Sequence, residues 1–130
     1  MNSDRDPRIL VCGSRDFRDD WLVLHHLQYG PWANWGSNFT LVHGRCPQGP
    51  DLWADIWAEG LDVPREAHPA DWATHGKRAG FIRNAEMVAT LDPSHGGDMV
   101  LAFWDGESKG TKHTIDLALK AKINTEVIFS

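Results

Sequence analysis

The 130-residue chain lacks most of the features that mark secreted, membrane or metal-binding proteins. Its two cysteines, Cys12 and Cys46, are too few for a disulfide framework, which favours a reducing compartment. No apolar run approaches the length of a membrane span, and the polar first residues do not resemble a signal peptide. No group of Cys and His has zinc spacing. We therefore expect a soluble, cytoplasmic protein without a metal or a resident cofactor.

Positive charge is also scarce, because 13 Lys and Arg oppose 18 Asp and Glu and leave a net charge of −5. This balance argues against non-specific nucleic-acid binding, which depends on many cationic contacts to phosphates. However, several cationic side chains fall in or beside glycine-containing loops, namely Arg15, Arg45, Lys77, Arg78, Arg83, Lys109 and Lys112. A locally positive site on an acidic body fits a small anionic ligand better than a polymer.

Short apolar runs and amphipathic stretches alternate along the whole chain. We expect strands at 8–12, 39–42, 63–67, 98–104 and 126–129, and helices at 21–29, 50–59, 80–91 and 111–122. This alternation predicts right-handed βαβ crossovers within one domain, preceded by a flexible terminus at 1–7. The expected fold is a doubly wound, Rossmann-like sheet, mostly parallel, with strand order 3-2-1-4-5 and helices on both faces. Its winding reverses between strands 1 and 4, where ligands of such sheets bind.

Glycine-containing loops follow the strands that border this crevice. The segment after strand 1 is 13–16 (GSRD), and the segment after strand 2 is 43–51 (HGRCPQGPD). Strand 4 is followed by 105–111 (DGESKGT), which leads into a helix. Glycine lets backbone amides approach a phosphate, and a helix N-terminus adds free N–H groups and a positive dipole. A single such loop is weak evidence, but two at neighbouring strands favour a phosphate or ribose-phosphate site. The Walker and GxGxxG motifs are both absent, which argues against dehydrogenase chemistry.

A further polar cluster spans residues 70–84. Arg83 lies among apolar neighbours there, and we expect ligand contact, with a surface helical position as the alternative. Most of the seven tryptophans are expected to fill the core, although one could stack on a base. The predicted ligand-binding residues are Gly13, Ser14, Arg15, His43, Gly44, Gly49, Asp51, Trp72, Arg83, Asn84, Gly106, Ser108, Lys109, Gly110 and Thr111.

These residues also carry a family resemblance that covers nearly the whole chain in order. It rests on residues 9–17 (ILVCGSRDF), His43-Gly44 through Gly49-Pro50-Asp51, Ala70-Asp71-Trp72, Ala79-Gly80 with Arg83-Asn84 and Met87, and Gly106 with Ser108, Gly110 and Thr111. The chain resembles the YspA/YpsA-related branch of the SLOG superfamily, which includes small bacterial and phage proteins. That superfamily also takes in the LOG phosphoribohydrolases and the DNA-processing protein DprA. The resemblance implies a Rossmann-like fold and a pocket for a nucleotide derivative.

One departure from the LOG pattern bears on activity. LOG enzymes cleave the N-glycosidic bond of nucleoside monophosphates with an arginine and a glutamate. The resemblance matches the segment of that arginine to residues 83–87 and the position of that glutamate to Thr114. A hydroxyl cannot stabilise an oxocarbenium-like transition state as a carboxylate does. If the chain is a hydrolase, the catalytic candidates are Arg83, Glu107 and Glu86.

The leading hypothesis is therefore binding, sensing or sequestration of a nucleoside phosphate, ADP-ribose or NAD-like ligand at the carboxyl ends of strands 1 and 4. N-glycoside hydrolysis is the alternative. DprA-like binding of single-stranded DNA comes third, since charge and the absence of an added domain disfavour it. We also expect a homo-oligomer, because Trp53 and Trp57 lie one helical turn apart and the LOG-like relatives pair through helices.

Overall fold

A computed structural model describes residues 5–17 and 19–129 and contains one five-stranded sheet. The strands are β1 (Arg8–Gly13), β2 (Thr40–His43), β3 (Arg65–Ala67), β4 (Met99–Trp104) and β5 (Asn124–Phe129). Their order is β3-β2-β1-β4-β5, and every neighbouring pair is parallel. The predicted Rossmann-like fold and strand order are confirmed, and the sheet is wholly rather than mostly parallel.

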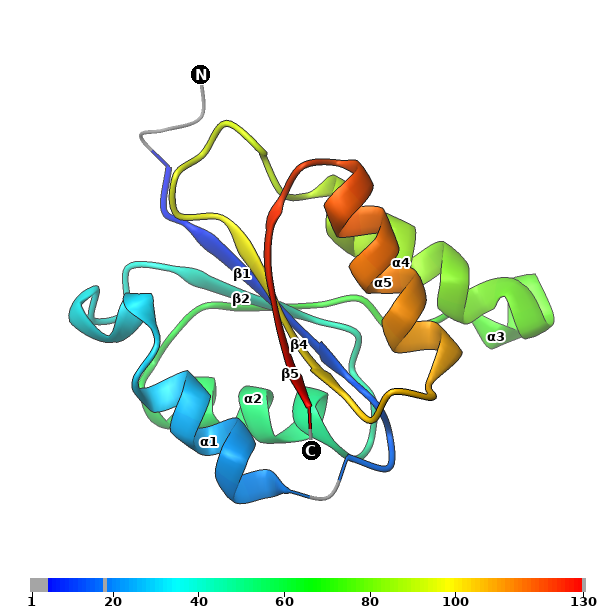
Figure 1. The fold of residues 1–130 in the computed structure, drawn as a ribbon, viewed down its shortest axis with the longest axis horizontal. Coiled ribbons are helices and arrows are strands. Elements are labelled where there is room, and N and C mark those ends of the chain that lie inside the picture. The colour runs from blue at the N-terminus through cyan, green and yellow to red at the C-terminus, as the bar shows by residue number, and fades with distance from the viewer. Residues whose placement is uncertain (1–4, 18, 130) are drawn as a thin grey trace.

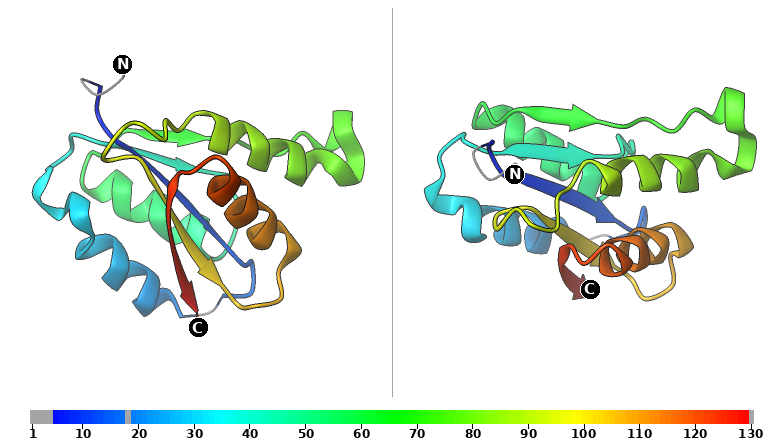
Figure 2. Two further views of the ribbon diagram at one scale, coloured as in Figure 1. Left: turned by 45° about the horizontal axis from the view of Figure 1, so that its top comes forward. Right: turned by 90° about the horizontal axis from the view of Figure 1, so that it is seen from above.

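Helices cover both faces of the sheet (Figures 1 and 2). The longer ones are α1 (Asp20–Gln28) and α2 (Pro50–Gly60) on one face, and α4 (Ala79–Ala89) and α5 (Lys109–Lys120) on the other. Three short segments escaped prediction: the 3₁₀ turns η1 (Pro31–Asn34) and η2 (Gly76–Arg78), and the helical turn α3 (Trp72–His75). Residues 71–78 are all exposed and project from the body of the domain (Figure 2). No helix in the described ranges is long and apolar enough to cross a membrane.

The ends of several elements differ from expectation for local reasons. The third strand begins at Arg65 instead of residue 63, because Pro64 has no N–H and uses only its carbonyl, which accepts from the Leu41 N–H at 2.8 Å. The last long helix begins at Lys109 rather than residue 111, because the Ser108 side chain caps it. The closing strand begins at Asn124, two residues earlier than predicted.

The central strands are buried on both sides. Alternate residues of β1 contribute to different clusters, since Ile9 packs with α1 and α2 whereas Leu10 packs with α4 and α5. Trp32 is fully buried, and Trp53 and Trp57 pack against the first cluster. The tryptophans are therefore mainly core residues, as expected.

The idea that Trp53 and Trp57 form an exposed patch is wrong, because the side of α2 that carries them lies against the core. The large exposed apolar side chains of this layer are instead Trp21, which is 76% exposed, with Tyr29, Ile56 and Leu61.

A buried carboxylate closes the edge of the sheet where the strands begin. The Asp98 side chain is fully buried, pairs with Arg5 at 2.6 Å and accepts the backbone N–H groups of Arg8 and Asp92, each at 2.9 Å. Burial alone would raise the pKa of Asp98, but these hydrogen bonds hold it below its ordinary value. These contacts of Asp98 hold the start of β1 against the loop before β4, at the edge of the sheet opposite to the one where the strands end.

Candidate functional site

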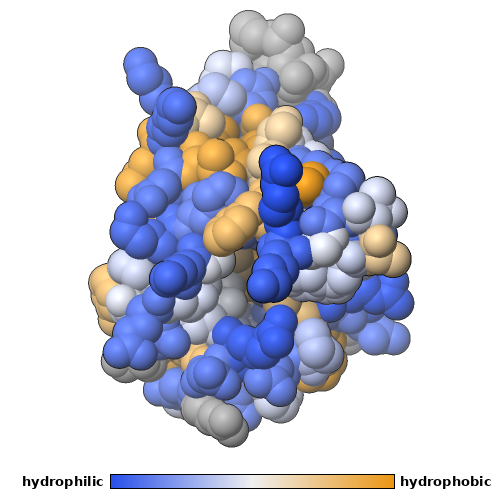
Figure 3. Space-filling model, turned by 90° about the vertical axis from the view of Figure 1, so that its right-hand side faces the viewer, coloured by the Kyte–Doolittle hydropathy of each residue, from blue (hydrophilic) through white to orange (hydrophobic). Residues whose placement is uncertain are grey.

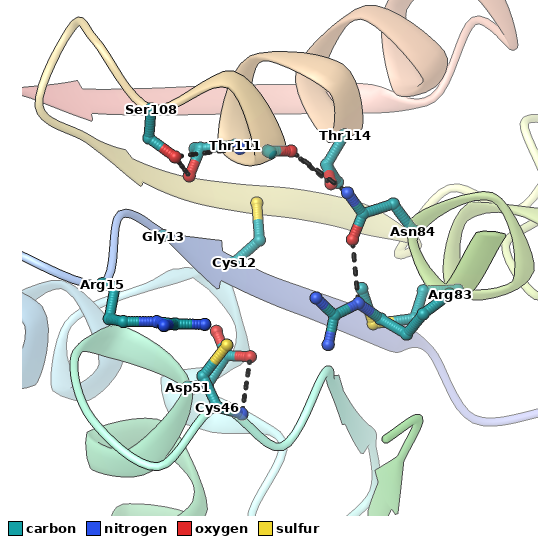
Figure 4. Close-up of a pocket in the computed structure, with 12 residues that line it drawn as sticks. Cys12, Gly13, Arg15, Cys46, Asp51, Arg83, Asn84, Ser108, Thr111 and Thr114 are labelled. Carbon is teal, nitrogen blue, oxygen red and sulfur yellow. Dashed lines mark hydrogen bonds between the residues drawn. The ribbon is translucent and has the colours of Figure 1, made fainter. Parts of the chain in front are cut away.

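A cleft of about 130 Å³ opens where β1 and β4 end, at the point where the winding of the sheet reverses (Figure 4). Its walls come from the end of β1, the loop before α2, the first turn of α2, the middle of α4 and the start of α5. The lining residues are Cys12, Gly13, Arg15, Cys46, Asp51, Arg83, Asn84, Met87, Ser108, Gly110, Thr111 and Thr114. The surface at this end of the molecule is mainly hydrophilic (Figure 3).

Gly13 lets the start of α2 pack directly against the end of β1. A Cβ atom at this position would lie 2.3 Å from Pro50 Cγ and 2.9 Å from the carbonyl oxygen of Phe103, so no other residue fits without a shift. The next residue links two loops, because Ser14 N donates to the Phe103 carbonyl at 2.9 Å and Ser14 Oγ accepts from Asp105 N at 3.1 Å. The loops after β1 and β4 are thereby held together on one cleft, as the sequence predicted.

The N-terminus of α5 forms one wall of the cleft. Ser108 is its N-cap and accepts from the Thr111 N–H at 3.3 Å, while Asp105 accepts the N–H groups of Glu107 and Ser108, both at 2.8 Å. The hydrogen bonds from Ser108 and Glu107 lower the pKa of Asp105, so this loop is organised around a charged aspartate. The free N–H groups and positive dipole of the helix start favour an anion here.

Arg83 enters the cleft from α4 (Figure 4). Its Nη1 donates to the Gly44 carbonyl at 2.6 Å and its Nε to Asn84 Oδ1 at 3.0 Å, and Asn84 Nδ2 in turn donates to the Gly110 carbonyl at 3.2 Å. Both acceptors of Arg83 are neutral, and no carboxylate forms an ion pair with it within the described ranges. A half-buried guanidinium held in this way is a ready partner for an anionic ligand.

Gly44 makes the position of Arg83 possible. A Cβ atom at Gly44 would lie 2.5 Å from Arg83 Nη1 and 2.9 Å from Arg83 Cζ. The glycine is therefore needed for close approach of the guanidinium, although it does not itself line the cleft.

Asp51 lies in the first turn of α2, on the wall opposite α5, and Arg15 points toward it (Figure 4). It is only 5% exposed, and its Oδ2 accepts from the N–H groups of Gly44 at 3.0 Å and Cys46 at 3.5 Å. Burial raises the pKa of Asp51, against the opposing influence of nearby cationic groups.

The two thiols of the cleft are poor nucleophiles. Burial raises the pKa of Cys12, and burial together with the neighbouring Asp51 raises the pKa of Cys46. Both therefore stay protonated at neutral pH, and the reactive form of a cysteine is the thiolate. The described residues also contain no group of three or more His, Cys, Asp or Glu arranged to hold a metal ion.

His43 points away from the cleft. It is buried, its Nδ1 accepts from the Arg45 N–H at 3.0 Å, and its Nε2 lies 2.8 Å from Asp55 Oδ1. Because Nδ1 accepts a hydrogen bond, we assign the proton to Nε2, which then donates to Asp55. Asp55 also pairs with Arg65 at 3.2 Å, so His43 belongs to a separate hollow beside the edge strand β3.

The structure divides the predicted ligand-binding residues into two groups. Those that line the cleft are Gly13, Arg15, Asp51, Arg83, Asn84, Ser108, Gly110 and Thr111. Those that do not are Ser14, His43, Gly44, Gly49, Trp72, Gly106 and Lys109. Ser14 and Gly44 nevertheless support the walls. Gly49 borders an adjacent hollow, and Trp72 is exposed on α3.

Four lining residues escaped prediction: Cys12, Cys46, Met87 and Thr114. Cys12 and Met87 are apolar core positions by pattern, whereas Cys46 lies inside the loop already singled out. Thr114 is buried and donates from Oγ1 to the carbonyl of Gly110 at 3.3 Å, within its own helix.

The predicted catalytic acids lie outside the cleft. Glu107 is exposed on the loop before α5, and Glu86 is exposed on α4 with an oxygen 3.9 Å from His68 Nδ1. Asp51 is thus the carboxylate that lines the cleft in the part of the chain that the structure describes.

Comparison with a solved structure supports the architecture. The chain resembles the crystal structure of the C-terminal domain of a hydrogenase from Pyrococcus furiosus, with a TM-score of 0.52 and 16% identity, over 99% of this chain and 96% of that one. At this level of identity the likeness shows the fold alone.

Two sequence comparisons give the family. The chain is 41% identical over 128 residues to the Gene 61 protein of Mycobacterium phage D29, covering 89% of this chain and 91% of that protein. Residues 7–75 match the sequence profile of the YspA, cpYpsA-related SLOG family, and this segment includes β1, β2 and the first turn of α2 with their cleft residues. The chain belongs to the YspA, cpYpsA-related SLOG family.

Proposed function

We propose that the protein binds a nucleotide-derived ligand, such as a nucleoside phosphate, ADP-ribose or an NAD-like compound, for sensing or sequestration. The observation that carries the proposal is Arg83, which is half-buried and lines a cleft that the N-terminus of α5 also borders. Among the described residues, its hydrogen-bond acceptors are both neutral. Arg15 adds a second guanidinium. A phosphate group of the ligand would complete the hydrogen bonding of these donors.

The cleft is large enough for only a part of such a ligand. At about 130 Å³ it is smaller than the roughly 300–1,000 Å³ of typical small-molecule pockets. It suits a phosphate and a sugar, so the base would lie outside at the rim. Trp72 is 55% exposed, and Gly80 lies near both Trp72 and Arg83, since a Cβ atom on Gly80 would be 3.5 Å from Trp72 Cη2 and 3.8 Å from Arg83 Nη2. We propose that the base stacks on Trp72.

Binding is favoured over N-glycoside hydrolysis because of the side chains around the cleft. Thr114 occupies the position at which LOG hydrolases carry a glutamate, and its hydroxyl donates a hydrogen bond to the Gly110 carbonyl of its own helix. The acids Glu107 and Glu86 do not line the cleft. Hydrolysis of a glycosidic bond uses a pair of carboxyl groups, whereas Asp51 is the one acidic side chain that lines the cleft among the described residues.

Two experiments test the proposal. Small molecules released from the heat-denatured protein can be identified by mass spectrometry. Purified protein can be titrated with inorganic phosphate, ribose 5-phosphate, the four ribonucleoside 5′-monophosphates, ADP-ribose and NAD in a calorimeter. A ligand at 100 times its dissociation constant should add about 2.7 kcal/mol to the free energy of unfolding.

Arg83→Ala should weaken binding of the ligand that performs best, while Arg78→Ala, which changes an exposed cation outside the cleft, should not. If none of these compounds binds, or if Arg83→Ala leaves the affinity unchanged, the proposal is wrong.

A further inference from the structure

Asp51 places a carboxylate in a cleft that otherwise suits an anion. Burial raises the pKa of Asp51, but the two backbone N–H groups that donate to it favour the ionised form, and an ionised carboxylate repels a nearby phosphate. The two groups therefore do not share one subsite. The residues are arranged in this way: Ser108 and Thr111 lie on the α5 wall of the cleft, and Asp51 lies on the opposite wall (Figure 4). The cleft therefore has a donor-rich wall for a phosphate and an acceptor on the other side for a different part of the ligand.

Only one oxygen of Asp51 is used by the backbone of the protein. The N–H groups of Gly44 and Cys46 both donate to Oδ2, and within the described ranges no N–H or O–H group donates to Oδ1. The neighbouring thiol of Cys46 is a weak donor. Because Asp51 lines the cleft, a donor group of a ligand can reach the acceptor capacity that Oδ1 retains.

The charges around Asp51 favour a neutral donor from the ligand. Arg15 and Arg83 line the same cleft on either side of Asp51, so a ligand ammonium group would meet two positive charges. A hydroxyl group donates a hydrogen bond without adding charge. In a phosphorylated ligand small enough for this cleft, such hydroxyls belong to the sugar.

We propose that Asp51 accepts a hydrogen bond from a ribose hydroxyl of the ligand and makes the cleft selective for ribonucleotide derivatives over their deoxy counterparts. The inference rests on the proposed function, and it adds a specificity-determining residue and a sugar class to it. It does not involve any bond being broken.

The test compares matched ligands on the wild-type protein before any residue is changed. The ribonucleoside 5′-monophosphate that binds best is titrated beside its 2′-deoxy, 3′-deoxy and 2′,3′-dideoxy analogues and inorganic phosphate, at one pH and salt concentration. Loss of a hydrogen bond to a charged acceptor should weaken the dideoxy analogue about ten- to a hundredfold. Inorganic phosphate should still bind, because its subsite is on the other wall.

Asp51→Asn then assigns the effect to the residue. Its amide oxygen can still accept from the Gly44 N–H, but its NH₂ group, a donor, takes the place of Oδ1. The variant should lose affinity for the ribonucleotide and keep that for the dideoxy analogue within about twofold. Glu107→Gln is the matched control, because it removes an exposed carboxylate near α5 that does not line the cleft, and it should preserve the discrimination.

Several results would overturn the inference. Equal affinity of the wild-type protein for the ribonucleotide and its dideoxy analogue would overturn the inference, even if Asp51→Asn failed to fold. This result would not contradict the proposal that the cleft binds a phosphate group. Discrimination that persists in Asp51→Asn, or equal losses for both ligands, would give Asp51 a structural role only. If neither phosphate nor any nucleotide binds, the proposed function fails and the inference fails with it.

Discussion

Replacing Gly44 by alanine tests whether the position of the Arg83 guanidinium controls ligand binding. The new Cβ would lie 2.5 Å from Arg83 Nη1, closer than real contacts allow, so the guanidinium must swing away and lose its 2.6 Å hydrogen bond to the Gly44 carbonyl. A hydrogen bond from a charged group to a ligand contributes about 1.5–3 kcal/mol, so the displacement should weaken phosphate or nucleotide binding about ten- to a hundredfold. The fold should suffer less, by about 1 kcal/mol, because the clash falls on the end of a long side chain.

Isothermal calorimetry and thermal unfolding of the same preparations separate the two effects. Gly60→Ala is the matched control, because a Cβ atom there meets nothing within 4 Å and the residue lies at the far end of α2. The expected outcome is a large loss of affinity with a small loss of stability in Gly44→Ala, and neither in Gly60→Ala. Unchanged affinity in Gly44→Ala would refute the argument that the Gly44 carbonyl positions Arg83 for the ligand.

Three further predictions concern stability, activity and assembly. Asp98→Ala should lower the free energy of unfolding by about 2–4 kcal/mol, because Arg5 loses its partner and two backbone N–H groups lose their acceptor. Since the folded-state pKa of Asp98 is depressed, its contribution is present above the unfolded-state pKa of about 3.9 and is lost as pH falls through the folded value. Denaturant unfolding of wild-type and variant protein should therefore converge in acid, and a constant difference down to pH 2 would contradict this account. Nucleoside monophosphates incubated with the protein should release no free base by chromatography. Turnover near 1 per second, the low end of ordinary enzymes, would overturn the binding proposal, and its loss in Asp51→Asn would identify the catalyst. Finally, self-association remains a prediction, which now rests on the exposed Trp21 of α1 and on Tyr29, the residue that follows this helix. Light scattering at micromolar concentration should give a mass above that of the monomer, and this mass should fall in Trp21→Ser; a monomeric wild type would contradict the prediction.

The course of the sheet could be predicted from the sequence because each strand carries a strong local signal. The continuous apolar run of β1 and that of β4 are typical of strands buried on both faces, and the helical stretches between strands require crossovers. Strand order then places the loops after β1 and β4 together. The cleft residues Gly13 and Ser108 follow from this order, since Gly13 ends β1 and Ser108 lies in the loop that follows β4.

Side-chain direction was harder to predict because it depends on where an element ends. The second strand extends to His43, one residue beyond expectation, and successive strand residues point to opposite faces. His43 therefore faces Asp55 instead of the cleft. Likewise, the spacing of Trp53 and Trp57 places them on one side of a helix but does not say whether that side faces the sheet or solvent.

The contact between Gly13 and Pro50 means that the residues at these two distant positions constrain each other in evolution. A larger residue at position 13 can be accepted only if the start of α2 moves away or position 50 becomes smaller. Movement of α2 would carry Asp51 with it, out of reach of whatever it meets in the cleft. Changes at these positions should therefore occur together in relatives, and those that lose the pair should differ in ligand preference before they differ in fold.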